Sequence, residues 1–374
     1  MRAALLPLLV ILMGANFREH VIATDLKGGY QVVAADLNGD GKPDLIALGT
    51  QMTELVWFEN PTWERHVMAS GLPNMINLAV WDTDGDGIPE IVLAYGFNMK
   101  AEASKGMVAV LKHNGDPRQP WTLIEIDRIP TSHRIRWADI DGSGHKVAIN
   151  APLIGVNAVA PDYRDHVPLV YYRPGEWKRT LIANDNEGVQ HGITIVDWDG
   201  KGRDAILTLS FLGIDLYRYK GNRWSRTAIS KGNPDPWPKS GSSDLAVGRT
   251  GKQRFLAAIE PWHGNQVVVY YEHRGQWQRN VIDDSLLDAH TILTADLDGN
   301  GRDQIVAGMR GKPYQVLIYS RSDNESRRWT RRVLDTGTMA AASCAAVDLN
   351  ADHRIDLACI GSATANLKWY ENIK

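Results

Sequence analysis

Short apolar stretches recur along the whole chain, and turn residues separate each stretch from the next. The segments 291–295 (TILTA), 305–309 (IVAGM) and 315–320 (QVLIYS) are examples, and they are rich in β-branched and apolar side chains. Stretches of this length between Gly- and Asp-rich turns are typical of β-strands. The pattern therefore predicts an all-β protein.

The strands recur in units of about 50 residues, which is the spacing of a repeat architecture. Between its first and second strands each unit carries an Asp-rich loop. The loops and the strands after them read DLNGDGKPDLIA from Asp36, DTDGDGIPEIVLA from Asp82, DIDGSGHKVAIN from Asp139, DWDGKGRDAILT from Asp197, DLDGNGRDQIVAG from Asp296 and DLNADHRIDLACI from Asp348. A degraded copy, VGRTGKQRFLAAI, has Gly248 and Thr250 at the first two acidic positions. A fourth strand with an aromatic-plus-arginine signature, such as EWKRTLI or QWQRNVI, ends each unit. Seven units of four strands predict a seven-bladed β-propeller.

The last unit stops at WYENIK without a fourth strand, and the missing strand, NFREHVIAT at residues 16–24, lies near the N-terminus. We expect this strand to complete the last blade, because closure of the ring leaves no open sheet edge. A parallel β-helix has shorter coils than this period, and an eight-bladed ring needs a repeat that the sequence does not contain. The prediction is one propeller domain over residues 16–374.

Residues 1–15 have the pattern of a secretory signal peptide, in which Arg2 precedes an apolar run and Gly14 and Ala15 follow it. The run is shorter than the roughly 20 residues that cross a membrane. We therefore expect a secreted protein, periplasmic or extracellular, without a membrane span. A formal net charge of -3 provides no basic field for nucleic acid, so we expect no such partner.

Cys344 and Cys359 are the two cysteines of the chain. An exported protein with two cysteines suggests a disulfide. However, pairing Asp348 with Asp356 across the hairpin sets Cys344 opposite Ile360, which points the two thiols to opposite faces. We expect two buried free thiols.

The Asp-rich loops place oxygen ligands at alternating positions with a glycine at the turn, which suits Ca²⁺. Three loops look complete; their ligands are Asp36, Asn38, Asp40 and Asp44; Asp82, Asp84, Asp86 and Glu90; and Asp348, Asn350, Asp352 and Asp356. The sixth copy keeps Asp296, Asp298 and Asn300 but has Gln304 at the closing position, and the third and fourth copies have Val147 and Ala205 there. We expect calcium to stabilise turns rather than to take part in chemistry.

The histidines follow a second pattern. The first strand of each blade runs toward its Asp-rich loop, so the residue six positions before the first Asp lies near the axis at the opposite mouth of the ring. Three blades have a histidine there, and the other four have different residues; the histidines are His133, His191 and His290, and the others are Tyr30, Ile76, Ser242 and Ala342. Converging imidazoles can bind a transition metal or act as acid and base, although each could also be purely structural.

The loops between second and third strands open on the same mouth. In the fifth blade this loop reads IEPWHGNQ and contains Glu260, Trp262 and His263. An acid, an indole and an imidazole suit a sugar site, and a tryptophan that caps the core is the alternative. Equivalent loops contain Tyr95, Lys100 and Arg310, which we take as substrate contacts or as a solvated rim. The longest such loop, residues 151–167, could partly cover the mouth.

The segments SHRIRWADIDGSG, APLIGVNAVAP, IEPWHGNQVVVY and AHTILTADLDGNG resemble the propeller domain of aldos-2-ulose dehydratase and bacterial proteins with VCBS or FG-GAP repeats. The resemblance implies metal-assisted β-elimination on a 2-keto sugar such as an aldos-2-ulose or 1,5-anhydrofructose, with Zn²⁺ or Mg²⁺. In this reading His133, His191 and His290 share the metal-binding and base roles, and His263 or Glu260 protonates the leaving group. The fungal enzyme also has cupin domains, which this sequence does not contain.

Two other functions fit the same residues. A uronate polysaccharide lyase needs the same base and a cation such as Arg310 for the acid group. A non-catalytic propeller could use the mouth to bind a glycan or a protein. Such a platform needs aromatic side chains but no imidazole cluster, so the histidines favour an enzyme.

Overall fold

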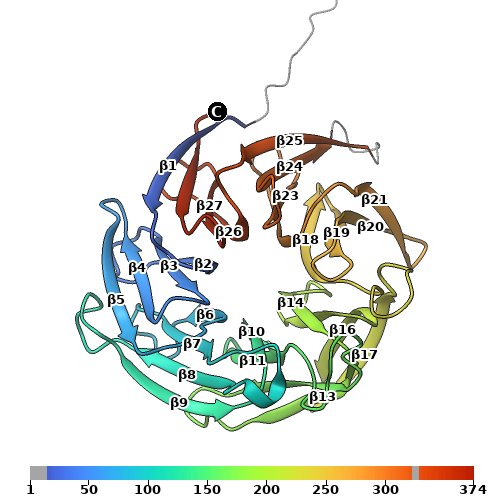
Figure 1. Ribbon diagram of the computed structural model, residues 1–374, viewed down its shortest axis with the longest axis horizontal. Coiled ribbons are helices and arrows are strands. Elements are labelled where there is room, and N and C mark those ends of the chain that lie inside the picture. Colours follow the sequence, from blue (N-terminus) through green and yellow to red (C-terminus); the bar gives the residue numbers. More distant parts are fainter. Residues whose placement is uncertain (1–14, 322–327) are drawn as a thin grey trace, which may run out of the picture.

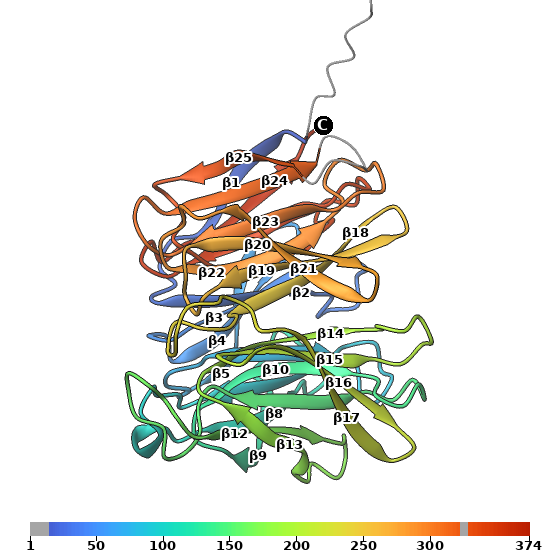
Figure 2. The same ribbon diagram turned by 90° about the vertical axis from the view of Figure 1, so that its right-hand side faces the viewer.

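The computed structural model describes residues 15–321 and 328–374. Seven four-stranded antiparallel sheets surround one axis, as Figure 1 shows. The predicted seven-bladed propeller is therefore confirmed. The edge-on view in Figure 2 shows the sheets of neighbouring blades lying face to face. The predicted signal peptide, residues 1–15, lies outside the described residues except for Ala15.

Each sheet has its first strand nearest the axis. The first two blades are β2 (Gly29–Ala35), β3 (Asp44–Gly49), β4 (Glu54–Glu59), β5 (Glu64–Ser70) and β6 (Asn77–Trp81), β7 (Glu90–Tyr95), β8 (Met107–Lys112), β9 (Thr122–Arg128). The next two are β10 (Ser132–Ala138), β11 (Val147–Pro152), β12 (His166–Tyr172), β13 (Thr180–Glu187) and β14 (Gln190–Val196), β15 (Ala205–Ser210), β16 (Gly213–Lys220), β17 (Arg223–Ser230).

The fifth and sixth blades are β18 (Asp244–Thr250), β19 (Gln253–Glu260), β20 (Gln266–His273), β21 (Gln276–Asp283) and β22 (Ala289–Ala295), β23 (Gln304–Met309), β24 (Gln315–Arg321), β25 (Trp329–Thr336). The seventh has the order β26 (Ala341–Val347), β27 (Asp356–Gly361), β28 (Leu367–Asn372) and β1 (Phe17–Ala23). One short 3₁₀ helix, η1 (Ala101–Ala103), interrupts the loop after β7. No helix in the described part of the chain is long and apolar enough to cross a membrane.

The N-terminal strand closes the ring as predicted. β1 pairs antiparallel with β28, in a register that runs from Phe17 opposite Asn372 to Ala23 opposite Leu367. β1 lies at the outer edge of the last blade beside the C-terminus (Figure 1). The first and last parts of the chain therefore share one sheet.

The second strand of a blade has the most apolar sequence because neighbouring strands and neighbouring blades cover it on all sides. β3, β7, β11, β15, β23 and β27 are buried over their whole length. Strands buried on both faces read as continuous apolar runs rather than as alternating ones. This explains why segments such as 305–309 show no polar alternation.

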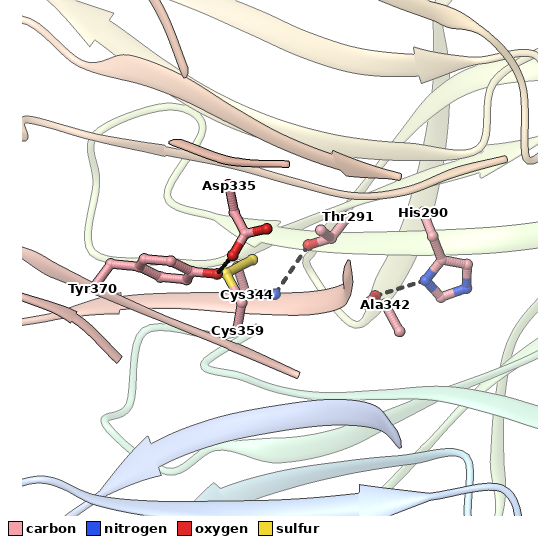
Figure 3. Close-up of a disulfide and its surroundings, with 7 residues drawn as sticks. All are labelled: His290, Thr291, Asp335, Ala342, Cys344, Cys359 and Tyr370. Atoms are coloured by element: carbon pink, nitrogen blue, oxygen red, sulfur yellow. Dashed lines mark hydrogen bonds between the residues drawn. A yellow bond between two sulfur atoms is a disulfide. The ribbon is translucent and has the colours of Figure 1, made fainter. Parts of the chain in front are cut away.

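The prediction of two free thiols was wrong, since Cys344 and Cys359 form a disulfide (Figure 3). β26 and β27 pair with Val347 opposite Asp356, one residue away from the register that we assumed. This shift sets Cys344 directly opposite Cys359, with 4.1 Å between their Cα atoms. A slip of one residue moves a side chain to the other face of a strand, and this accounts for the error.

Candidate active site

The first strands of three blades bring their histidines together at the mouth opposite the Asp-rich loops. His133, His191 and His290 are 2%, 1% and 2% exposed. The His133 and His191 ring centroids lie 4.9 Å apart, and those of His191 and His290 lie 5.3 Å apart. The shared register seen in the sequence thus corresponds to a real cluster.

Tyr30 occupies the same register in the first blade and belongs to the cluster. Its hydroxyl lies 2.9 Å from His133 Nε2 and 3.2 Å from His290 Nε2. One hydroxyl proton can serve either imidazole, so Tyr30 links two rings that do not bond each other directly. The sequence contained this signal, because Tyr30 stands at the position that holds histidine in three other blades.

Backbone carbonyls fix the orientation of two imidazoles. His290 Nδ1 lies 2.7 Å from the Ala342 carbonyl oxygen (Figure 3), and His191 Nδ1 lies 3.3 Å from that of Ser243. A carbonyl oxygen only accepts, so the proton of His290 is on Nδ1. His191 Nδ1 also lies 3.1 Å from the Ser243 hydroxyl, and its proton is on Nδ1 because the Arg134 guanidinium, which only donates, faces Nε2. The lone pair on Nε2 of each ring therefore points into the mouth.

His263 joins the cluster from the turn after β19. Its Nε2 lies 3.2 Å from His191 Nε2, and its Nδ1 lies 3.2 Å from Nη2 of Arg310. A guanidinium only donates, so His263 Nδ1 accepts and its Nε2–H donates to His191. Arg310 also contacts Asp288 at 2.8 Å. Sequence reasoning placed His263 and Arg310 at this mouth, and the structure brings both to it.

Arg134 follows His133 on β10 and was not among the predicted site residues. It is 5% exposed, and its guanidinium lies 3.2 Å from His133 Nε2 and 3.4 Å from His191 Nε2. A cavity of about 510 Å³ along the axis is lined by Arg134, Tyr30 and His290. The strand alternation did not identify Arg134, because a residue next to an inward-facing histidine is expected to face the other way.

The cluster favours neutral imidazoles. Burial and the charge of Arg134 hold the pKa of His133 and of His191 well below the usual value. Burial and the charge of Arg310 act in the same direction on the pKa of His290, and they lower the pKa of His263 to about 3. Neutral imidazoles can accept a proton or bind a metal.

Aromatic side chains form one side of the mouth. The Trp262 ring centroid lies 4.8 Å from that of His263, 5.7 Å from that of Tyr163 and 5.9 Å from that of Phe211. Tyr163 comes from the long loop between β11 and β12, so that loop packs against Trp262 beside the mouth. Aromatic faces next to polar groups suit a sugar ring. Tyr163 and Phe211 were missed because neither stands in a repeated motif.

The structure does not bring Glu260, Tyr95 or Lys100 into the cluster. Glu260 is fully buried inside the fifth blade, where it accepts from Tyr270 Oη at 2.5 Å and from Arg279 Nε at 2.8 Å. The Tyr95 hydroxyl donates to Glu125 on an outer strand. Lys100 is an exposed residue at the start of η1. The proton-donor role expected for Glu260 does not fit this placement.

Glu260 instead completes a clamp that recurs in other blades. In each clamp a third-strand tyrosine donates to an acid that also pairs with a cation. The other sets are Tyr172, Asp127 and Arg179; Tyr217, Asp185 and Arg226; Tyr319, Asp283 and Arg331; and Tyr370, Asp335 and Lys368. In these four sets the acid comes from the outer strand of the preceding blade, where β17 has Ser230. Glu260 supplies the carboxylate that Ser230 cannot.

The Asp-rich loops are tied together by their own first aspartate. Asp36 Oδ1 accepts from the backbone of Gly39 and Asp40, and Oδ2 accepts from Gly41. The closing carboxylates contact backbone too: Asp44 accepts from Leu37 and Asn60, and Asp356 accepts from Leu349 and Asn372. Burial raises the pKa of Asp44 to about 6. The closing residue, at the ninth position of the motif, thus connects the Asp-rich loop to the end of the third strand of the blade, whether or not an ion is bound.

The second Asp-rich loop has a lysine beside its carboxylates, and the sixth has a glutamine at its closing position. Asp82, Asp84 and Asp86 offer carboxylate oxygens within 4.8 Å of one another. Lys112 contacts Asp84 and lies 3.6 Å from Glu90. In the sixth loop, Gln304 takes the closing position and donates to Asp298 at 3.1 Å. An ammonium group beside the second loop competes with a cation for these carboxylates.

The fold, the repeats and the mouth define a seven-bladed propeller with a buried histidine cluster. A family model of the FG-GAP-like repeat matches residues 36–93. A model of the aldos-2-ulose dehydratase β-propeller domain matches residues 105–273, which include His133, His191 and His263. The resemblance inferred from the sequence is therefore confirmed.

Among curated proteins, aldos-2-ulose dehydratase of Phanerodontia chrysosporium is 27% identical over 235 residues. The match covers 55% of this chain and 26% of the relative, so the chain corresponds to about a quarter of that enzyme's length. The similarity associates this propeller with a sugar dehydratase.

Solved structures support the fold. An Agrocybe aegerita lectin that recognises non-reducing terminal N-acetylglucosamine has a TM-score of 0.52 at 14% identity, over 83% of this chain and 81% of that one. BBS1N, solved in complex with ARL6DN, has a TM-score of 0.59 at 11% identity, over 97% of this chain and 98% of that one. At these identities the likeness concerns the fold alone.

Proposed function

We propose that the histidine mouth is the active site of a carbon–oxygen lyase that removes water from a keto sugar of the aldos-2-ulose or 1,5-anhydrofructose type. The observation that carries the proposal is the convergence of neutral imidazoles from three first strands on one mouth, beside an aromatic wall. The similarity to the dehydratase propeller supports the substrate class. The signal-like pattern of residues 1–15 supports export.

The residues fit a divalent metal. His191, His263 and His290 offer ring nitrogens within 4.8 Å of one another. Metal binding through His263 Nε2 would require its proton on Nδ1, where Asp288 Oδ1 lies 3.6 Å away. Carbonyl bonds to the Nδ1–H groups of His191 and His290 are the kind of support that orients metal-ligating histidines. Imidazole ligands suit Zn²⁺ better than Mg²⁺. When bound, the metal supplies a Lewis acid for the ketone oxygen of the sugar.

His133 is the cluster histidine outside this group, and we assign it the base. A ketone at C2 acidifies the proton on C3, and the Nε2 lone pair of His133 accepts that proton. The C3–H electron pair passes through the enolate to form the C3–C4 double bond as the C4–O bond breaks. The leaving hydroxide takes up a proton equivalent to the one that His133 removed from C3 and departs as water, so the site returns to its starting protonation state. Tyr30, within hydrogen-bonding distance of His133 and His290, is placed to carry a proton between the two imidazoles.

A variant pair separates the two histidine roles. Purified protein is incubated with 1,5-anhydrofructose and glucosone while the enone absorbance is recorded, and its metal content is measured. His133→Ala should lose roughly 100-fold or more in turnover and keep its metal, whereas His191→Ala should lose both. A wild-type protein that binds glycans but turns over neither sugar would instead support the binding-platform function.

We also propose that Ca²⁺ binds the Asp-rich loops as a structural ion. The alternating oxygens of the first and seventh loops support this assignment, whereas Lys112 weakens it for the second. Isothermal titration of the chelated protein tests it. Calcium uptake lost in both Asp36→Ala and Asp348→Ala would support the assignment, and no heat of binding in the wild type would contradict it.

A further inference from the structure

Arg134 is a buried cation without an acidic partner. Its side chain comes from β10 into the centre of the histidine cluster and is 5% exposed. Within residues 15–321 and 328–374, no carboxylate oxygen lies within 4.0 Å of its guanidinium nitrogens. Its hydrogen-bonding partners are the Tyr30 hydroxyl at 3.4 Å and two imidazoles at 3.2 and 3.4 Å. All of these partners are neutral groups.

Two other semi-buried arginines have a carboxylate partner, and Arg136 in the same cavity donates instead to Asn77 at 2.9 Å and to the Ile135 carbonyl at 2.7 Å. Arg310, at the same mouth, contacts Asp288 at 2.8 Å, and Arg279 contacts Glu260 at 2.8 Å. Charge-assisted bonds between guanidinium and carboxylate have this length, while the contacts of Arg134 are 0.4 Å longer or more. The chain thus provides a carboxylate for two arginines and none for the most buried one.

The charge at the mouth is therefore unbalanced. His133 and His191 accept from Arg134 through Nε2, and an accepting nitrogen carries no proton, so both rings are neutral. Asp288 balances Arg310, and in the axial cavity two guanidiniums, those of Arg134 and Arg136, face one carboxylate, that of Asp244. One positive charge remains. A buried charge without a partner is costly, and an anionic ligand removes that cost.

We propose that Arg134 binds a carboxylate of the ligand, so that the mouth binds an acidic sugar more tightly than an uncharged sugar of nearly the same shape. This role was expected of Arg310, whose pairing with Asp288 makes it unsuitable. The proposal rests on the proposed function for the place of binding but does not depend on which reaction follows. It favours a sugar acid within the substrate class, because a keto sugar that also carries a carboxylate meets both requirements.

The test compares binding of D-glucuronate with binding of its methyl ester, a neutral molecule of nearly the same shape. Calorimetric or competition titration at low salt should give an affinity for the acid about 10- to 100-fold higher, the usual effect of a charge-assisted bond. Arg134→Gln should bring the two affinities together. The matched control is Arg136→Gln, since Arg136 lines the same cavity and donates to Asn77 and to the Ile135 carbonyl. It should keep the preference for the acid.

Three results would overturn the proposal: equal affinity of the wild type for acid and ester, no binding of either, or a preference that persists in Arg134→Gln. If Arg134→Gln does not fold, the wild-type comparison still decides, and Arg134→Lys should keep part of the preference because it keeps the charge without the planar fork. The enone assay distinguishes failure of this proposal from failure of the proposed function. Elimination without acid preference refutes only the role of Arg134, and acid preference without elimination refutes only the lyase.

Discussion

Replacing Glu260 by Gln should destabilise the fold without disabling the mouth. Gln retains the size and one acceptor for Tyr270 but leaves the Arg279 guanidinium without its counter-ion at 2.8 Å. Breaking a buried ion pair costs about 3–5 kcal/mol. Because the Arg279 side chain keeps 23% exposure, we take the lower end, about 3 kcal/mol. With an unfolding entropy of about 2.1 cal/mol/K per residue over about 360 residues, this lowers the Tm by about 4 °C.

A second substitution tests the cause. Ser230 stands where four other blades have the clamp acid, so Ser230→Asp in the Glu260→Gln background should restore most of the lost Tm. Differential scanning calorimetry of the wild type, both single variants and the double variant completes a double-mutant cycle. The reasoning is refuted if Glu260→Gln shifts the Tm by less than about 1 °C, or if Ser230→Asp restores nothing.

Three further predictions concern the disulfide, the calcium loops and the histidines. Thiol titration of the denatured, unreduced protein should find no free thiol, and two titratable thiols would contradict the pairing. Reduction of the Cys344–Cys359 bond, which closes a loop of 15 residues, should lower the unfolding free energy by about 3 kcal/mol. Chelation should lower the Tm of the wild type but not that of a variant lacking both Asp36 and Asp348, and equal shifts would count against calcium in these loops. NMR should show His263 uncharged from pH 8 down to pH 5, because its folded pKa of about 3 lies below the ordinary 6.5. Since the unfolded chain binds that proton below pH 6.5 and the folded chain does not, this group lowers the unfolding free energy as the pH falls toward 5, and a titration midpoint near 6.5 would exclude this environment.

The fold was predictable because the sequence shows the same strand pattern in each repeat. Each of the seven units repeats the same strand order. The last unit lacks a fourth strand, and the segment at residues 16–24 supplies it. The histidine cluster was predictable for the same reason, since His133, His191 and His290 share one register, and a register fixes distance from the axis. Both inferences depend on the repeat period and on the strand order within a repeat, and both of these can be inferred from the sequence.

Features that depend on side-chain direction or on a single residue were not predictable. The disulfide was missed because a hairpin register uncertain by one residue reverses the face of a cysteine. Arg134 was missed because neighbours on a strand normally face opposite ways, whereas β10 has a register shift between Ser132 and Arg134, and such irregularities redirect side chains. We predicted Glu260 at the mouth because the turn that follows it lies there. The signal for its clamp role was Ser230, which stands where four other blades have the clamp acid.

The central claim is that chemistry takes place at the histidine mouth. The most direct measurement is the turnover of a keto sugar, recorded by enone absorbance, in His133→Ala and Glu260→Gln at a temperature where both remain folded. The account predicts a loss of roughly 100-fold or more for His133→Ala, the usual effect of removing a base, and near wild-type turnover for Glu260→Gln. Full activity in His133→Ala, together with loss in Glu260→Gln, would contradict it.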